Sequence, residues 1–191
     1  MEGGDLGGGK RSRAACGGYV CFEDEAGVTR RPPRGRTWGR RGRTPVVSVS
    51  GRRSGRLSVA GLIAMRPGSR TRPCHRLRTH PAGKGTRRSM SERDFIALVD
   101  RVHHLVRPPI ILVCLNTYVS RRMRDLVAER EWLTVFLLPA YSPDLNPVEG
   151  VWAHVKRSLA NLAVMALDRL ETLVRNRLKR LQYRPTPPTA S

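Results

Sequence analysis

The sequence is short of acidic residues, paired cysteines and long apolar runs, and each shortage excludes a class of protein. Only 15 Asp and Glu side chains accompany 36 Lys and Arg, so the formal net charge is +21 and the isoelectric point is near 11.5. The four cysteines form no C-x-x-C pair and do not combine with histidines at zinc-finger spacing. No stretch approaches the ~20 apolar residues of a membrane span, and the N-terminus lacks the apolar segment of a secretory signal. We therefore expect a cytoplasmic protein without a membrane partner.

The positive charge indicates a polyanionic partner, and nucleic acid is the first candidate. A second interpretation is equally open. Nearly all the basic residues are Arg, and the chain is rich in Gly, Ala and Pro, as the codons of a GC-rich genome would make it without any function. The length of 191 residues suits one domain with loose ends rather than two domains.

The first half of the chain is rich in Gly, Pro and Arg and contains three short runs of strand character. The first run ends in Glu23, Asp24 and Glu25, ahead of a turn that we expect at Gly27. The other two runs flank a Gly/Arg turn and are predicted to pair as a hairpin. We expect a disordered Gly/Arg-rich arm at 1–18, strands at 19–22, 45–50 and 56–65, and loops at 28–43 and 66–90.

The second half alternates helical and strand patterns. Ser91 is the expected N-cap of a helix whose apolar residues recur at helical spacing as far as Leu105. Two unbroken aliphatic runs separated by a helix predict a right-handed parallel crossover in an α/β layer. This element order is that of a ribonuclease-H-like mixed sheet with flanking helices, although other α+β folds share it. The predicted helices are 91–106, 120–131, 149–160 and 167–181, the strands are 110–113 and 133–138, and a tail closes the chain at 186–191.

The few carboxylates matter most, because two-metal phosphodiester chemistry needs several of them at the ends of strands and helices. Asp24 lies at the end of the first predicted strand, although a solvated acidic turn is the plainer interpretation of the triplet around it. Glu149 falls in the first turn of a predicted helix, where Asn146 is the expected cap and Pro147 the first helical residue. The helix dipole keeps such a carboxylate ionised. Stabilisation of the helix by Glu149 is an equally ordinary explanation.

The segment LPAYSPDLNPVEGVWAHVKRSL at 138–159 resembles the signature of the mariner-like bacterial insertion-sequence transposases, the Tc/mariner superfamily with a DDE endonuclease domain. FEDEAG resembles the family's first catalytic strand, RGRTPVVSVSG the strand after it, and LVRNRLKRLQYRP its closing helix. The resemblance covers roughly 19–185, which we expect to form the catalytic domain. It implies a ribonuclease-H-like fold and metal-dependent DNA cleavage and strand transfer in transposition. Asp24 and Glu149 would then be the first and last catalytic carboxylates, and would hold Mg²⁺ or Mn²⁺.

The same resemblance implies partners: double-stranded DNA at the transposon ends and at the target, and a second copy of the chain in a homodimer. It also implies a bacterial cytoplasmic location at the nucleoid. In the loop after the first strand, we expect Trp38 to stack on a base and neighbouring arginines to contact phosphates. A solvated loop explains the same pattern, and ordinary structural roles explain the histidines. The loop residues proposed to bind nucleic acid are Arg34, Arg36, Trp38, Arg40, Arg41 and Arg43.

Departures from the family pattern are concentrated at the predicted fourth strand. There the family has V-W-D-N-x-x-x-H, whereas this chain has VCLNTY, and the simplest alignment loses two residues, including the middle catalytic Asp. Residues 26–91 and 101–124 contain no Asp or Glu, and the Cys114 thiol is a poor ligand for an oxygen-preferring cation. The family's helix-turn-helix modules are also missing before residue 19, and the resemblance ends at Pro185. We therefore predict a truncated, catalytically defective copy. A non-catalytic DNA-binding remnant is the alternative, and a chain that does not fold cooperatively is a third.

Overall fold

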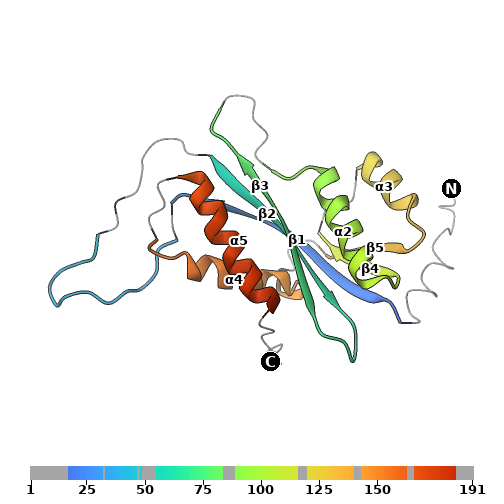
Figure 1. Ribbon diagram of the computed structural model, residues 1–191, viewed down its shortest axis with the longest axis horizontal. Coiled ribbons are helices and arrows are strands. Elements are labelled where there is room, and N and C mark those ends of the chain that lie inside the picture. The colour runs from blue at the N-terminus through green and yellow to red at the C-terminus, as the bar shows by residue number, and fades with distance from the viewer. Residues whose placement is uncertain are drawn as a thin grey trace.

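A mixed five-stranded sheet forms the centre of the computed structural model and lies between two layers of helices (Figure 1). The strand order is β3-β2-β1-β4-β5, in which the first three strands are antiparallel and β1, β4 and β5 are parallel. This arrangement confirms the predicted ribonuclease-H-like α/β fold. The structure describes residues 17–31, 33–46, 48, 55–83, 89–115, 120–139, 143–162 and 166–183. The elements are β1 Tyr19–Thr29, β2 Arg56–Met65, β3 Arg72–His80, α2 Glu92–Val106, β4 Ile110–Cys114, α3 Arg121–Ala128, β5 Leu133–Leu137, a 3-10 turn Pro143–Leu145, α4 Val148–Ser158 and α5 Leu167–Tyr183.

The sheet carries a separate apolar cluster on each face, because successive strand residues point to opposite sides. Tyr19 and Cys21 of β1 pack with α2 and α3 on one face. Ala26 and Val28 of the same strand pack with α4 and α5 on the other. In Figure 1, α2 and α3 lie to one side of the strands and α4 and α5 to the other. The functional side chains of β1 are therefore divided between two faces.

Helix α2 begins where the sequence predicts, at a capping box. Ser91 Oγ accepts the Asp94 N–H at 3.2 Å, and Asp94 Oδ2 accepts the Ser91 N–H at 2.9 Å. The same carboxylate accepts hydrogen bonds from Arg76 and Arg78 of β3. Burial works against ionisation, but the bonds from Arg78, Ser91 and Arg76 outweigh it and hold the pKa of Asp94 well below its usual range. Asp94 thus joins a helix cap to an edge strand.

Strand β1 does not end at Phe22, and the predicted turn at Gly27 is wrong. The strand continues through the acidic triplet to Thr29, because β2 pairs with it from Val20 onwards. Gly27 serves a different purpose. A Cβ there would lie 2.1 Å from Nη2 of Arg56, so the absent side chain leaves room for that guanidinium. Asp24 consequently lies within a strand, not at its end.

The predicted hairpin partner of residues 56–65 is also wrong. The described residues of 45–50 belong to no strand, and β2 instead pairs with β3, inside the segment 66–90 that was predicted to be a loop. The arginines of β3 interrupt the apolar pattern by which a strand is recognised in a sequence. Arg76 and Arg78 are tolerated because β3 is an edge strand and their partner, Asp94, lies on the adjoining helix.

Predictions for the second half are confirmed to within a few residues, with one exception at Leu105, which is 52% exposed instead of packed. Ser120 caps α3, since its hydroxyl accepts the Met123 N–H at 3.0 Å. Apart from Gly17 and Gly18, the predicted arm at 1–18 lies outside the described residues, as does the tail at 186–191. The described helices are all too short or too polar to cross a membrane.

Candidate active site

Asp24 of β1 is directed to the face of the sheet that α4 covers. Its Oδ2 accepts a hydrogen bond of 2.9 Å from Nε1 of Trp152. Its neighbours point the other way: Glu23 is only 2% exposed, and Oε1 of Glu25 accepts the Met90 N–H at 3.2 Å. The triplet is therefore not a solvated acidic turn. It places a single carboxylate on the α4 face.

Glu149 reaches the same place from the first turn of α4. The helix begins at Val148 with Pro147 at the N-cap position, one residue later than predicted, and Asn146 Oδ1 just before it accepts the Val148 N–H at 3.1 Å. The amide nitrogen of Asn146 also donates to the Glu23 carbonyl at 3.3 Å, which ties the start of the helix directly to β1. Asn146 is itself buried. This second bond was not predicted, since a sequence pattern reveals a cap but not the strand beside it.

The carboxyl groups of Asp24 and Glu149 lie close enough to interact. Burial raises the pKa of Asp24 above its ordinary value, and the charge of Glu25 acts in the same direction, against the hydrogen bonds from Trp152 and Glu149. Burial, and then the charge of Asp24, raises the pKa of Glu149, while Lys156 opposes the shift. Two half-buried carboxylates this close together form a site for a shared proton or a cation.

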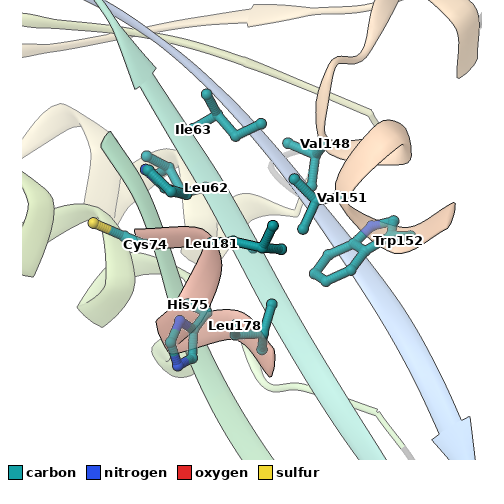
Figure 2. Close-up of a pocket in the computed structure, with 11 residues that line it drawn as sticks. Leu62, Ile63, Cys74, His75, Val148, Val151, Trp152, Leu178 and Leu181 are labelled. Atoms are coloured by element: carbon teal, nitrogen blue, oxygen red, sulfur yellow. The ribbon is translucent and has the colours of Figure 1, made fainter. Parts of the chain in front are cut away.

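Trp152 can reach Asp24 because Gly61 lies opposite it on β2. The register pairs Gly61 with Asp24, and a Cβ on Gly61 would lie 2.6 Å from Cη2 of the indole. Figure 2 shows Trp152 over β2, among apolar side chains of α4 and α5. The sequence did carry a signal, since a glycine inside the apolar run SVAGLIA marks a close approach.

The position where the family's middle Asp is expected has no carboxylate. Cys114 ends β4 opposite Glu23, and its side chain is buried in the cluster on the α2 face. Burial, reinforced by the charge of Glu23, raises the pKa of this thiol, so it stays neutral. Half-buried Leu115 follows directly after the end of β4, one residue past the last pair of the parallel register, Glu23 with Cys114. Asn116, where the motif continues, lies outside the described residues.

In the part of the chain that the structure describes, no group of three or more His, Cys, Asp or Glu side chains could hold a metal ion. The histidines have the ordinary roles expected of them: His103 stacks on Trp132 with ring centroids 3.8 Å apart, and His154 is exposed on α4. Asp24 and Glu149 therefore stand as a pair.

The loop predicted to bind nucleic acid lies apart from Asp24 and Glu149. Residues 33–46, hereafter the arginine loop, extend away from the sheet on the side of α4 and α5 (Figure 1). Trp38 is fully exposed. All the loop residues proposed as contacts are exposed, namely Arg34, Arg36, Trp38, Arg40, Arg41 and Arg43.

Solved structures that share this fold include complexes of the Mos1 transposase. Over 90% of this chain, a Mos1 mariner paired-end complex with Mn matches with a TM-score of 0.57 at 16% identity. A Mos1 paired-end complex with Mg matches 85% of the chain with a TM-score of 0.57 at 16% identity. A Mos1 paired-end complex with the left transposon end matches 86% with a TM-score of 0.56 at 15% identity. The chain spans about half of each of these proteins, 56%, 48% and 52% respectively.

The family comparison rests on the sequence itself. No curated protein is significantly similar to this chain. The family model described as the DDE superfamily endonuclease matches residues 19–173, from the first residue of β1 into α5. The match includes Asp24, Glu149 and the segment between them where the third carboxylate is expected. With residues 19–173 matched, which is most of its length, the chain belongs to the DDE superfamily endonucleases.

Proposed function

We propose that this chain is the catalytic domain of a DNA transposase in which Asp24 and Glu149 are the first and last metal-binding carboxylates. This proposal is supported by the position of both carboxylates on the α4 face of a ribonuclease-H-like sheet, close enough to interact and beside the end of β4. Carboxylates in such a site hold the divalent ions that activate a nucleophile and steady a leaving oxygen on DNA.

The residues present fit only part of that metal site. The Asp24–Glu149 pair offers hard oxygen ligands, and a divalent cation would stabilise the charged form of both carboxylates, whose pKa values burial raises. At the end of β4, however, a neutral thiol and a leucine stand where a third carboxylate is needed. We therefore propose that the chain does not support Mg²⁺- or Mn²⁺-dependent cleavage or strand transfer.

The partner that we propose is double-stranded DNA, at transposon ends and at the target, bound through the arginine loop. Its support is five exposed arginines around an exposed tryptophan, within a chain of net charge +21. A folded domain that keeps these contacts without the third carboxylate would bind DNA without cutting it, which is the second candidate function. We propose the homodimer and the location at the nucleoid on the family resemblance alone.

Two measurements test this proposal. Incubation of supercoiled plasmid with protein and Mn²⁺ should give no more nicking than the Glu149→Gln variant does. Robust nicking that Glu149→Gln abolishes would show that the site is competent.

Binding of a 30-bp duplex should weaken steeply with salt, because each phosphate contact contributes about −0.9 to the slope of log K against log salt. Substitution of the five loop arginines by Gln should make that slope shallower by about 4. An unchanged slope would exclude the loop as the contact surface.

A further inference from the structure

The base of the arginine loop is joined to the end of α4 by one residue, Asn161. Its Oδ1 accepts the Gly35 N–H at 3.1 Å, and its Nδ2 donates to the Gly35 carbonyl at 2.9 Å. Its own N–H donates to the Pro33 carbonyl at 3.1 Å. The φ of Asn161 is 60°, a left-handed conformation that asparagine adopts more readily than most residues. The side-chain amide of Asn161 thus bonds both the N–H and the carbonyl of Gly35, as the backbone of a neighbouring strand would.

Gly35 makes this approach possible. A Cβ at position 35 would lie 2.8 Å from the Cβ of Ala160, the residue before Asn161. The backbone of the loop therefore lies directly against the end of the helix, while Trp38, only three residues further on, is fully exposed. Two independent features, a bridging amide and a glycine contact, fix the same point.

We propose that Asn161 is a positioning residue that anchors the arginine loop to the C-terminal end of the helix that carries Glu149. Helix α4 has 11 residues and is about 16 Å long, so the anchor lies roughly five base pairs of duplex away from Glu149. A loop held at its base loses less conformational entropy when its arginines bind phosphates. This role in DNA binding rests on the proposed function, whereas the anchor itself does not.

The anchor is tested without DNA by limited trypsin digestion of the full chain, with cleavage after Arg36 and Arg40 followed by mass spectrometry. Asn161→Gly keeps the left-handed backbone but loses both side-chain bonds, and should speed this cleavage about tenfold. Gly35→Ala should do the same, and Gly35→Ala with Ala160→Gly should restore the slow rate. Asn176→Ala, which removes an exposed amide from α5, is the matched control. An unchanged rate in Asn161→Gly, or no rescue by Ala160→Gly, overturns the anchor.

The contribution to binding is tested by the affinity for a 30-bp duplex. Asn161→Gly should weaken binding severalfold with an unchanged salt slope, because the phosphate contacts remain. It should have no further effect in a chain whose loop arginines are Gln. If the loop arginines matter but Asn161→Gly leaves the affinity unchanged, the positioning role is refuted. If the loop arginines do not matter, the proposed DNA contact fails, while the digestion still decides whether the anchor exists.

Discussion

Leu115→Asp should supply the third carboxylate of the site. The parallel register pairs Glu23 with Cys114, whose side chain lies on the α2 face, and Leu115 is the next residue after the end of β4. Extension of the strand by one residue would place residue 115 level with Asp24 and on the α4 face, where Glu149 lies. Neighbouring strands are about 4.8 Å apart, so the new carboxylate would stand roughly 5 Å from Asp24.

The expected magnitude follows from this spacing. Without metal, two carboxylates about 5 Å apart repel each other by about 3 kcal/mol at an effective dielectric constant of 20. Such a cost lowers Tm by about 6–12 °C in a chain of this size. Binding of Mn²⁺ at about 100 times its Kd raises the free energy of unfolding by about 2.7 kcal/mol. Most of the decrease in Tm should therefore be reversed when Mn²⁺ replaces EDTA.

The assay is a thermal melt in EDTA and in Mn²⁺, followed by plasmid nicking. Leu115→Asn is the matched control, because it removes the same apolar contact without adding charge and should not respond to Mn²⁺. Leu115→Asp combined with Glu149→Gln should lose most of the response. Equal Tm values for Leu115→Asp in EDTA and Mn²⁺ would refute the placement of residue 115 beside Asp24. Mn²⁺-dependent nicking by this variant alone would support the proposed reaction.

Three further variants test the packing around the site. Trp152→Phe removes the hydrogen bond to Asp24 and should lower the free energy of unfolding by about 1.5–3 kcal/mol in urea titrations. Gly61→Ala should lower the free energy of unfolding by about 1–3 kcal/mol, because the new methyl group displaces the indole. In a double-mutant cycle, the effects of Trp152→Phe and Gly61→Ala should not add. Asp94→Asn should cost about 2 kcal/mol at pH 7. Because the folded-state pKa of Asp94 is depressed, that cost should shrink as the pH falls below about 4, whereas a cost independent of pH would contradict the ionised cap.

The second half of the fold is predictable from sequence because its helices and strands carry unmixed apolar patterns. The aliphatic run Ile110–Val113 and the helical spacing after Ser91 each have a single simple interpretation. The first half is less predictable, because its strands are stabilised by partners elsewhere in the chain. Strand β3 contains arginines that are neutralised by Asp94, a residue that no local pattern in β3 can reveal.

The candidate site is predictable in part for the same reason. The motif around Glu149 and the acidic triplet identify Asp24 and Glu149 as a candidate pair, and the structure brings them close enough to interact. Their catalytic role stays a prediction. The glycine inside the apolar run SVAGLIA indicates a close approach, but only the register of β1 and β2 identifies Trp152 as the side chain that approaches, because a glycine and an indole 91 positions apart share no local pattern.

The bond from Asn146 to the Glu23 carbonyl spans 123 positions of the sequence, which has a consequence for folding kinetics. A contact of such high separation forms late, since most of the chain must be ordered before it closes. On a ribosome that adds about 5–20 residues per second, α4 would be synthesised several seconds or more after β1. The two carboxylates therefore cannot meet until α4 has been synthesised, and a chain arrested before Asn146 would already contain all five strands of the described sheet but not the helix that covers Asp24.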